Sequence, residues 1–108
     1  MSVASQTLLL QMSAAACYAI AGAFMKASEG MSNLRPTLAV YALFAVGVTL
    51  HTLSMRYTTM GTAYILVLGL EAVAALVISV GHFREAYGVR EALGVILILA
   101  GGALVRGR

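Results

Sequence analysis

The sequence predicts an all-α integral membrane protein, a single domain over residues 1–108 with four transmembrane helices. Hydrophobic residues make up 61% of the chain, compared with about 45–50% in an average globular protein. Only 10% of the residues are charged, where about 25% is usual. The long apolar segments also lack the polar face that a soluble helix turns toward water. These observations favour a bilayer over an aqueous environment for most of the chain.

The first predicted helix covers about residues 8–27. It ends at a polar break that contains Lys26, Glu29 and the helix-stopping Gly30. The segment from Met1 to Thr7 carries no Lys or Arg, whereas a secretory signal begins with a basic region. We therefore expect this helix to be retained as the first span.

The second helix is predicted over about residues 36–53, opening at Pro36, which suits the first turn of a helix. His51 lies near the far end of this helix, and His82 lies in the polar break after the third helix. We expect both histidines at the membrane interface. The third helix is predicted over about residues 61–83. This run is apolar over 23 residues, enough to cross the roughly 30 Å hydrocarbon core, and has Glu71 near its middle.

The fourth helix is predicted over about residues 87–105. Its uncharged part, Ala92 to Val105, is only 14 residues long, so it spans the core if Arg90 and Glu91 lie among the headgroups. Gly94 and Gly101 are seven residues apart on one helical face, with Gly102 beside them. Small residues allow close helix approach, so these three glycines are a predicted dimer interface.

Basic residues are nearly balanced between the two membrane surfaces. An up-and-down chain brings three to one surface (Arg56, Arg106, Arg108) and four to the other (Lys26, Arg35, Arg84, Arg90). Orientation follows the Lys/Arg bias of short loops, so this balance permits an antiparallel homodimer. A partner chain or other signals can equally fix one orientation.

No clustered basic face is visible, so nucleic acid is not an expected partner, whereas membrane lipid is.

Three segments resemble the small multidrug resistance family of transporters. They are Met25-Lys26-Ala27-Ser28-Glu29-Gly30 followed by Pro36, then Gly61-Thr62-Ala63-Tyr64, and the last helix from Gly94 to Val105. The resemblance covers nearly the whole chain in length, helix count and loop spacing. It implies a four-helix subunit of the drug/metabolite transporter superfamily. Such subunits work as dimers, commonly antiparallel, that exchange protons for organic cations across the bacterial inner membrane.

The sequence departs from this family at three positions. Tyr18 stands where transporting members have a first-helix glutamate that binds substrate or protons. Val67 stands where the third helix typically has Trp, and Glu71 where it has a small residue. Tyr64, Val67 and Glu71 are spaced i, i+3 and i+7, on one side of the helix. If Tyr64 lines the cavity as the resemblance implies, Glu71 points into it about two turns away.

We therefore predict a proton-coupled exporter of a small organic solute, with a cation as the expected substrate and with Glu71, Tyr64, Tyr18 and Val67 at the substrate and proton site. Charged groups inside a membrane mark transport pathways by default. Three alternatives stay open. Glu71 can pair with Tyr18 or a basic side chain and serve the fold; the chain can be half of a heterodimer whose partner supplies the first-helix glutamate; or it can be a non-transporting subunit of a larger complex.

Catalysis and metal binding have no support in the sequence. There is no cluster of His, Cys, Asp and Glu, so no metal or other cofactor is predicted. Ser13, Thr49 and Ser79 have no evident base partner, so a nucleophilic enzyme is not expected.

Overall fold

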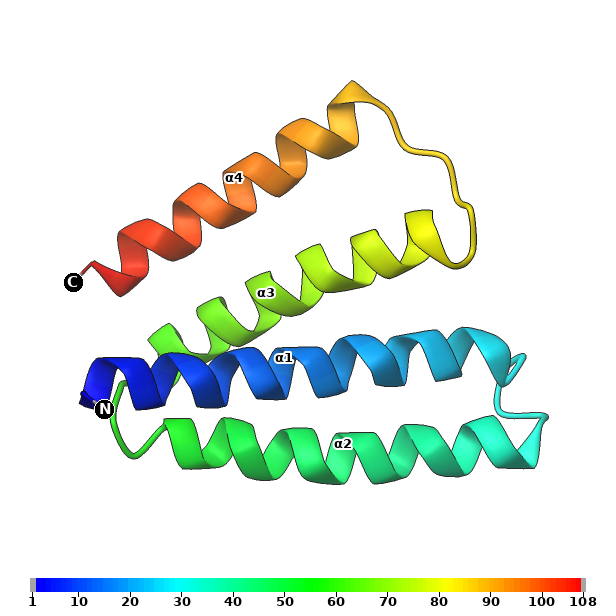
Figure 1. Ribbon diagram of the computed structural model, residues 1–108, viewed down its shortest axis with the longest axis horizontal. Helices are drawn as coiled ribbons and strands as arrows, with labels where there is room; N and C mark the ends of the chain where they lie inside the picture. The colour runs from blue at the N-terminus through cyan, green and yellow to red at the C-terminus, as the bar shows by residue number, and fades with distance from the viewer. Residues whose placement is uncertain (1, 108) are drawn as a thin grey trace.

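Four antiparallel helices make up the computed structural model, which describes residues 2–107 (Figure 1). The helices are α1 (Val3–Ala27), α2 (Leu34–Ser54), α3 (Met60–Gly81) and α4 (Val89–Arg106). No strand occurs within residues 2–107. The predicted all-α fold is confirmed.

The helix starts follow local capping. α1 begins at Val3, five residues before the predicted start, because the Ser2 hydroxyl accepts a hydrogen bond of 3.1 Å from the Ser5 N–H. α2 begins at Leu34 and has Pro36 in its first turn, where no intrahelical N–H is needed. α4 begins at Val89, and the Glu91 carboxylate accepts from the Gly88 N–H at 3.1 Å.

The turn between α1 and α2 is organised by Ser28. Its buried hydroxyl donates to the Met25 carbonyl at 2.7 Å and accepts from the Met31 N–H at 3.1 Å. Glu29, Gly30 and Met31 follow with φ values of 50°, 74° and 72°, so three successive residues have left-handed backbone. The conspicuous polar segment after the first helix thus forms a compact, hydrogen-bonded reversal of the chain.

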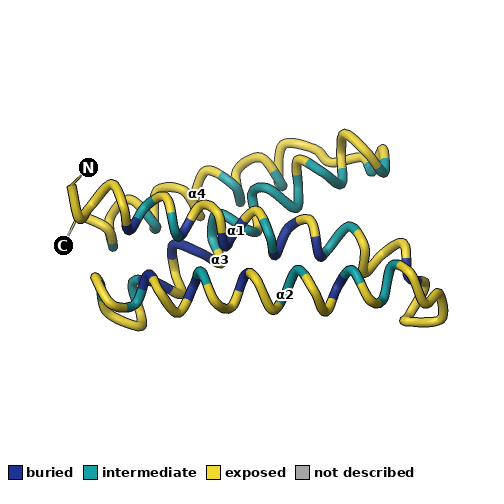
Figure 2. The backbone as a smooth tube through the Cα atoms, turned by 60° about the horizontal axis from the view of Figure 1, so that its bottom comes forward, coloured by how far each residue is buried: buried dark blue, intermediate teal, exposed yellow. Residues whose placement is uncertain are grey.

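Packing is centred on α1. α1 packs against both α2 and α3, whereas α4 approaches α3 alone among the described helices. Figure 1 shows α4 diverging from the other three helices, and Figure 2 shows that the buried helical positions lie on α1, α2 and α3 and none on α4. One face of α3 and most of α4 are therefore free of protein contact within the subunit.

The dimensions and apolar lengths fit a membrane. Three helices, α1, α2 and α3, are long and apolar enough to span a bilayer, and the molecule is 41 Å long, close to the about 40–45 Å of a bilayer with its headgroups. α4 has charged residues at both ends and is shorter. The alternation of the helices brings Arg56 and Arg106 to one end and Lys26, Arg35 and Arg90 to the other (Figure 1). Arg108 lies outside the described residues.

Candidate functional site

Glu71 lies in the middle of α3, three turns from either end of the helix. Its side chain is half-buried, and within residues 2–107 its carboxylate has no hydrogen bond or ion pair. Leu68, one turn away on the same side, is exposed, so this side of α3 is uncovered. Glu71 thus sits at membrane depth on an open face of the subunit without a protein counterion.

Tyr18 lies on the side of α1 that faces α2 and α3. Its ring packs against Phe44 at a centroid distance of 5.3 Å, and its hydroxyl lies 3.3 Å from Nδ1 of His51. The phenol is also close enough to Glu71 and Tyr64 to interact with both electrostatically. Tyr18 therefore links the first helix to polar groups on both neighbouring helices.

His51 is the residue of this cluster that sequence reasoning missed. We expected it at the interface, but its side chain is only 5% exposed and lies between Tyr18 of α1 and Tyr64 of α3. The His51 and Tyr64 rings meet edge-on, with centroids 4.9 Å apart. A signal was available: Gly47, His51 and Ser54 recur at helical spacing on α2, which marks the side facing α1.

Tyr64 and Val67 have different environments although they share one side of α3. Tyr64 is 46% exposed beyond its contact with His51. Val67 is fully buried against Ala14, Ala15 and Tyr18. The structure thus brings Tyr18, Tyr64 and Val67 together with His51, while Glu71 lies about one turn beyond Val67 on the open face. Val67 contacts its own subunit and does not line an open surface.

A close helix approach holds this cluster. A Cβ atom at Gly47 of α2 would lie 2.7 Å from Cε1 and 2.9 Å from Cδ1 of Tyr18, distances that real side chains do not tolerate. Only glycine lets the Tyr18 ring occupy this position beside α2.

The three glycines of α4 face two different directions. Among residues 2–107, no atom of a neighbouring residue lies within 4 Å of a Cβ built at Gly94 or Gly101. A Cβ at Gly102 would lie 3.5 Å from Leu66 of α3. Gly94 and Gly101 are therefore on a free face, and Gly102 faces the helix's own subunit.

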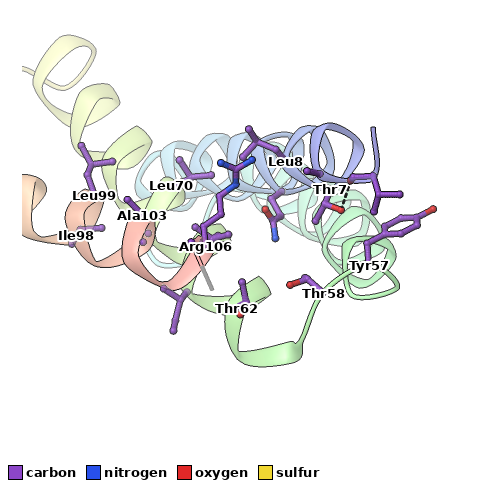
Figure 3. Close-up of a pocket in the computed structure, with 18 residues that line it drawn as sticks. Thr7, Leu8, Tyr57, Thr58, Thr62, Leu70, Ile98, Leu99, Ala103 and Arg106 are labelled. Atoms are coloured by element: carbon purple, nitrogen blue, oxygen red, sulfur yellow. Dashed lines mark hydrogen bonds between the residues drawn. The ribbon is translucent and has the colours of Figure 1, made fainter. Parts of the chain in front are cut away.

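A large cavity lies apart from all four predicted site residues. It has a volume of about 590 Å³ and lies between α1, α3 and α4, near the end where α1 begins and α4 ends (Figure 3). Thr7, Gln11, Thr62, Gly69, Leu99 and Arg106 are among its lining residues. We call this cavity the α4 groove.

A polar network closes the opposite end of the molecule. Lys26 of α1 forms an ion pair with Glu85 in the loop after α3, and Glu85 also accepts hydrogen bonds of 2.8 Å from Ser79 and from Tyr87. These contacts, the one from Lys26 foremost, lower the pKa of Glu85 to about 2. Ser79 therefore has a carboxylate partner that the sequence did not reveal. A carboxylate of such low pKa is too weak a base to activate a hydroxyl.

Comparison with known proteins agrees with this architecture. The family model described as "Small Multidrug Resistance protein" matches residues 7–98, which include Tyr18, Tyr64, Val67 and Glu71. The chain belongs to the small multidrug resistance family. Gly101 and Gly102 lie beyond the matched residues.

The chain is also similar in sequence to two named proteins. The chain is 32% identical over 74 residues to the nicotine metabolites export pump subunit NepA of Paenarthrobacter nicotinovorans. That match covers 68% of this chain and 64% of NepA. It is 29% identical over 86 residues, or 80% of each chain, to the quaternary ammonium compound-resistance protein QacH of Staphylococcus saprophyticus. This chain is thus a multi-pass membrane protein of the small multidrug resistance family that carries a tyrosine at position 18 and a glutamate at position 71.

Proposed function

We propose that this protein is a subunit of a dimeric, proton-coupled exporter of small organic cations in the inner membrane of a bacterium, with Glu71 as the group that binds substrate and proton in turn. The observation that carries the proposal is the unpaired Glu71 carboxylate on the open face of α3. A carboxylate at membrane depth is costly, by about 2.5–3.5 kcal/mol on insertion scales, and a purely structural role would provide it with a partner. None is found among residues 2–107.

The chemistry of the surrounding residues supports a cationic substrate. Glu71 supplies negative charge, and the exposed Tyr64 supplies an aromatic ring two turns away on the same side of the helix. The names of the two relatives, an export pump subunit and a quaternary ammonium resistance protein, agree with an export role. Release of a proton from Glu71 frees the carboxylate for the cation, so the two ligands compete for one site.

A dimer would enclose the Glu71 site that one subunit leaves open. The open face of α3 in one subunit does not enclose a solute, and α4 presents an uncovered glycine face for association. The near balance of basic residues between the two ends suits an antiparallel pair. Alternating access then follows from exchange between two packings around the midplane carboxylates.

Transport currents in proteoliposomes test the proposal. We expect native protein to give currents with a panel of organic cations under a pH gradient, and Glu71→Gln to give none, because the amide cannot exchange a proton or balance the cation. Glu91→Gln, which removes a carboxylate at the start of α4, is the matched control and should keep the currents. Equal currents from native protein and a folded, dimeric Glu71→Gln would refute Glu71 as the carrier group.

A heterodimer is the second candidate. Tyr18 stands where the family's first-helix glutamate is expected, and NepA is named as a subunit of a pump. In this case the partner chain supplies the missing carboxylate. Native protein alone would then be silent, and currents would appear only after reconstitution with a similar chain that has the first-helix glutamate. A neighbouring gene for such a chain with the opposite Lys/Arg bias would supply the candidate.

A further inference from the structure

The α4 groove is a second candidate binding site, distinct from the Glu71 face. On α3 it is lined by Thr62, Ile65, Leu66, Gly69 and Leu70, which lie on the side opposite Tyr64 and Glu71. Its volume of about 590 Å³ falls within the about 300–1,000 Å³ typical of ligand pockets. The groove and the proposed transport site therefore use two sides of the same helix.

The groove exists because α4 packs against α3 and against no other described helix. Gly69 of α3 packs against Ile98 of α4, and Gly102 of α4 packs against Leu66 of α3. These two glycines allow α3 and α4 to approach each other closely. α4 does not approach α1, and the space between them is lined by both. Ile65 and Leu99 line this space and remain about half exposed, so the groove opens sideways toward the acyl chains of a bilayer.

The charge of the groove favours an anion. Arg106 lies at its membrane-surface end, and Figure 3 shows its side chain extending from α4 across the groove. Within residues 2–107 Arg106 has no ion pair, and no acidic residue lines the groove. An organic cation would meet a like charge here and no counterion.

A buried amide lies deeper in the groove. Gln11 lines it one turn beyond Leu8 on α1, is only 1% exposed, and its Nε2 has no hydrogen-bond partner within the described chain. A buried donor without a hydrogen-bond partner destabilises the protein. A ligand that carries an oxygen acceptor as well as an anionic group would supply the missing partner.

We propose that the α4 groove binds an anionic phospholipid. Arg106 pairs with the phosphate, and the Gln11 amide, which lines the cavity, donates to an ester carbonyl. One acyl chain lies along Leu66, Leu70 and Leu99. Basic pockets between transmembrane helices are established sites for anionic headgroups. The lipid would act as a wedge that fixes the angle of α4 to the rest of the subunit.

Fluorescence quenching tests this directly, because the chain has no tryptophan. Leu99→Trp places a single indole in the groove, and Val46→Trp places one on an uncovered side of α2, where Val46 is 52% exposed and lies outside the groove. Each full-length variant is reconstituted with a small fraction of phosphatidylglycerol or phosphatidylcholine carrying brominated acyl chains. One basic contact predicts an about fivefold preference for phosphatidylglycerol at the groove indole and none at the control indole.

Further variants assign the preference. Arg106→Gln should abolish it, Gln11→Leu should reduce it, and Arg56→Gln, which removes a charge at the same end outside the groove, should leave it unchanged. Native mass spectrometry of unlabelled protein provides a check that needs no tryptophan: native protein should retain phosphatidylglycerol, and Arg106→Gln should lose it. Equal quenching by the two lipids, a preference that survives Arg106→Gln, or an indole that neither lipid quenches would each overturn the proposal. The last result would show that protein fills the groove. None of these outcomes depends on transport.

Discussion

At the scale of single residues, the polar cluster of the subunit is built around one ring. The resemblance to the family aligns Tyr18 with the first-helix acid; its phenol contacts His51 and lies near Glu71. If Glu71 has the proposed role, the ionisable group has moved from α1 to α3, and Tyr18 retains a hydrogen-bonding group on α1. Tyr18 can donate to a nitrogen or a carboxylate, but it cannot replace a carboxylate as a counterion at neutral pH.

Gly47→Ala should displace the Tyr18 ring and destabilise the subunit. The added methyl group would lie 2.7 Å from Cε1, and the ring cannot easily move because Phe44 and His51 flank it. Overpacking of this kind costs about 1–3 kcal/mol. The free energy of unfolding in mild detergent measures the effect. Gly61→Ala, where nothing lies within 4 Å, is the matched control and should be neutral or stabilising.

A double-mutant cycle attributes the cost to this contact. In a Tyr18→Leu background the smaller side chain leaves room for the methyl group, so Gly47→Ala should lose most of its effect. An undiminished cost there would place the strain elsewhere on α2.

At the scale of elements, the lengths of the apolar segments predicted much of the fold. They did not predict how the helices pack side by side. Four helices and their alternation followed from hydrophobic runs and polar breaks, since each run must cross the same bilayer. The burial of His51 did not follow, because proximity to a helix end indicates depth and says nothing of direction around the helix axis. The α4 groove was also invisible, since it depends on the angle between α3 and α4.

The network at the end of α3 should make the loop 82–88 sensitive to acid. The pKa of Glu85 is lowered to about 2, first by Lys26 and then by Ser79 and Tyr87. A carboxylate with a lowered folded-state pKa stabilises the fold above its ordinary pKa of 4.5, and this contribution is lost as the pH falls from 4.5 to about 2. The difference in unfolding temperature between native protein and Glu85→Gln should therefore be constant above about pH 5 and vanish near pH 2.

The same carboxyl group can be followed by carbon NMR titration. Lys26→Gln should raise the Glu85 pKa more than Ser79→Ala does, because the contact from Lys26 is the largest contribution. A Glu85 pKa near 4.5 in the native protein would contradict the network.

At the scale of the whole molecule, the uncovered face of α4 is the surface through which we expect the two subunits of the proposed dimer to meet. Gly94 and Gly101 have open space before them, and Leu97 and Leu104, on the same side of the helix, are 72% and 77% exposed. Glycines between protruding leucines allow two helices to interlock closely. Gly102 does not belong to this face, because it packs against Leu66 within the subunit.

Gly101→Leu should therefore weaken the dimer without unfolding the subunit. The bulky side chain fills the space that a partner helix needs, at a cost of about 1–3 kcal/mol, equivalent to an about 5- to 150-fold weaker association. Energy transfer between labelled subunits, measured over a range of protein-to-lipid ratios, gives the association constant. Gly61→Leu, a substitution at an equally open glycine at the start of α3, should leave the constant unchanged. If both variants associate as native protein does, subunits meet through another surface, and the open side of α3 that carries Glu71 becomes the first alternative, since it is also uncovered and carries the carboxylate that the proposed dimer would enclose.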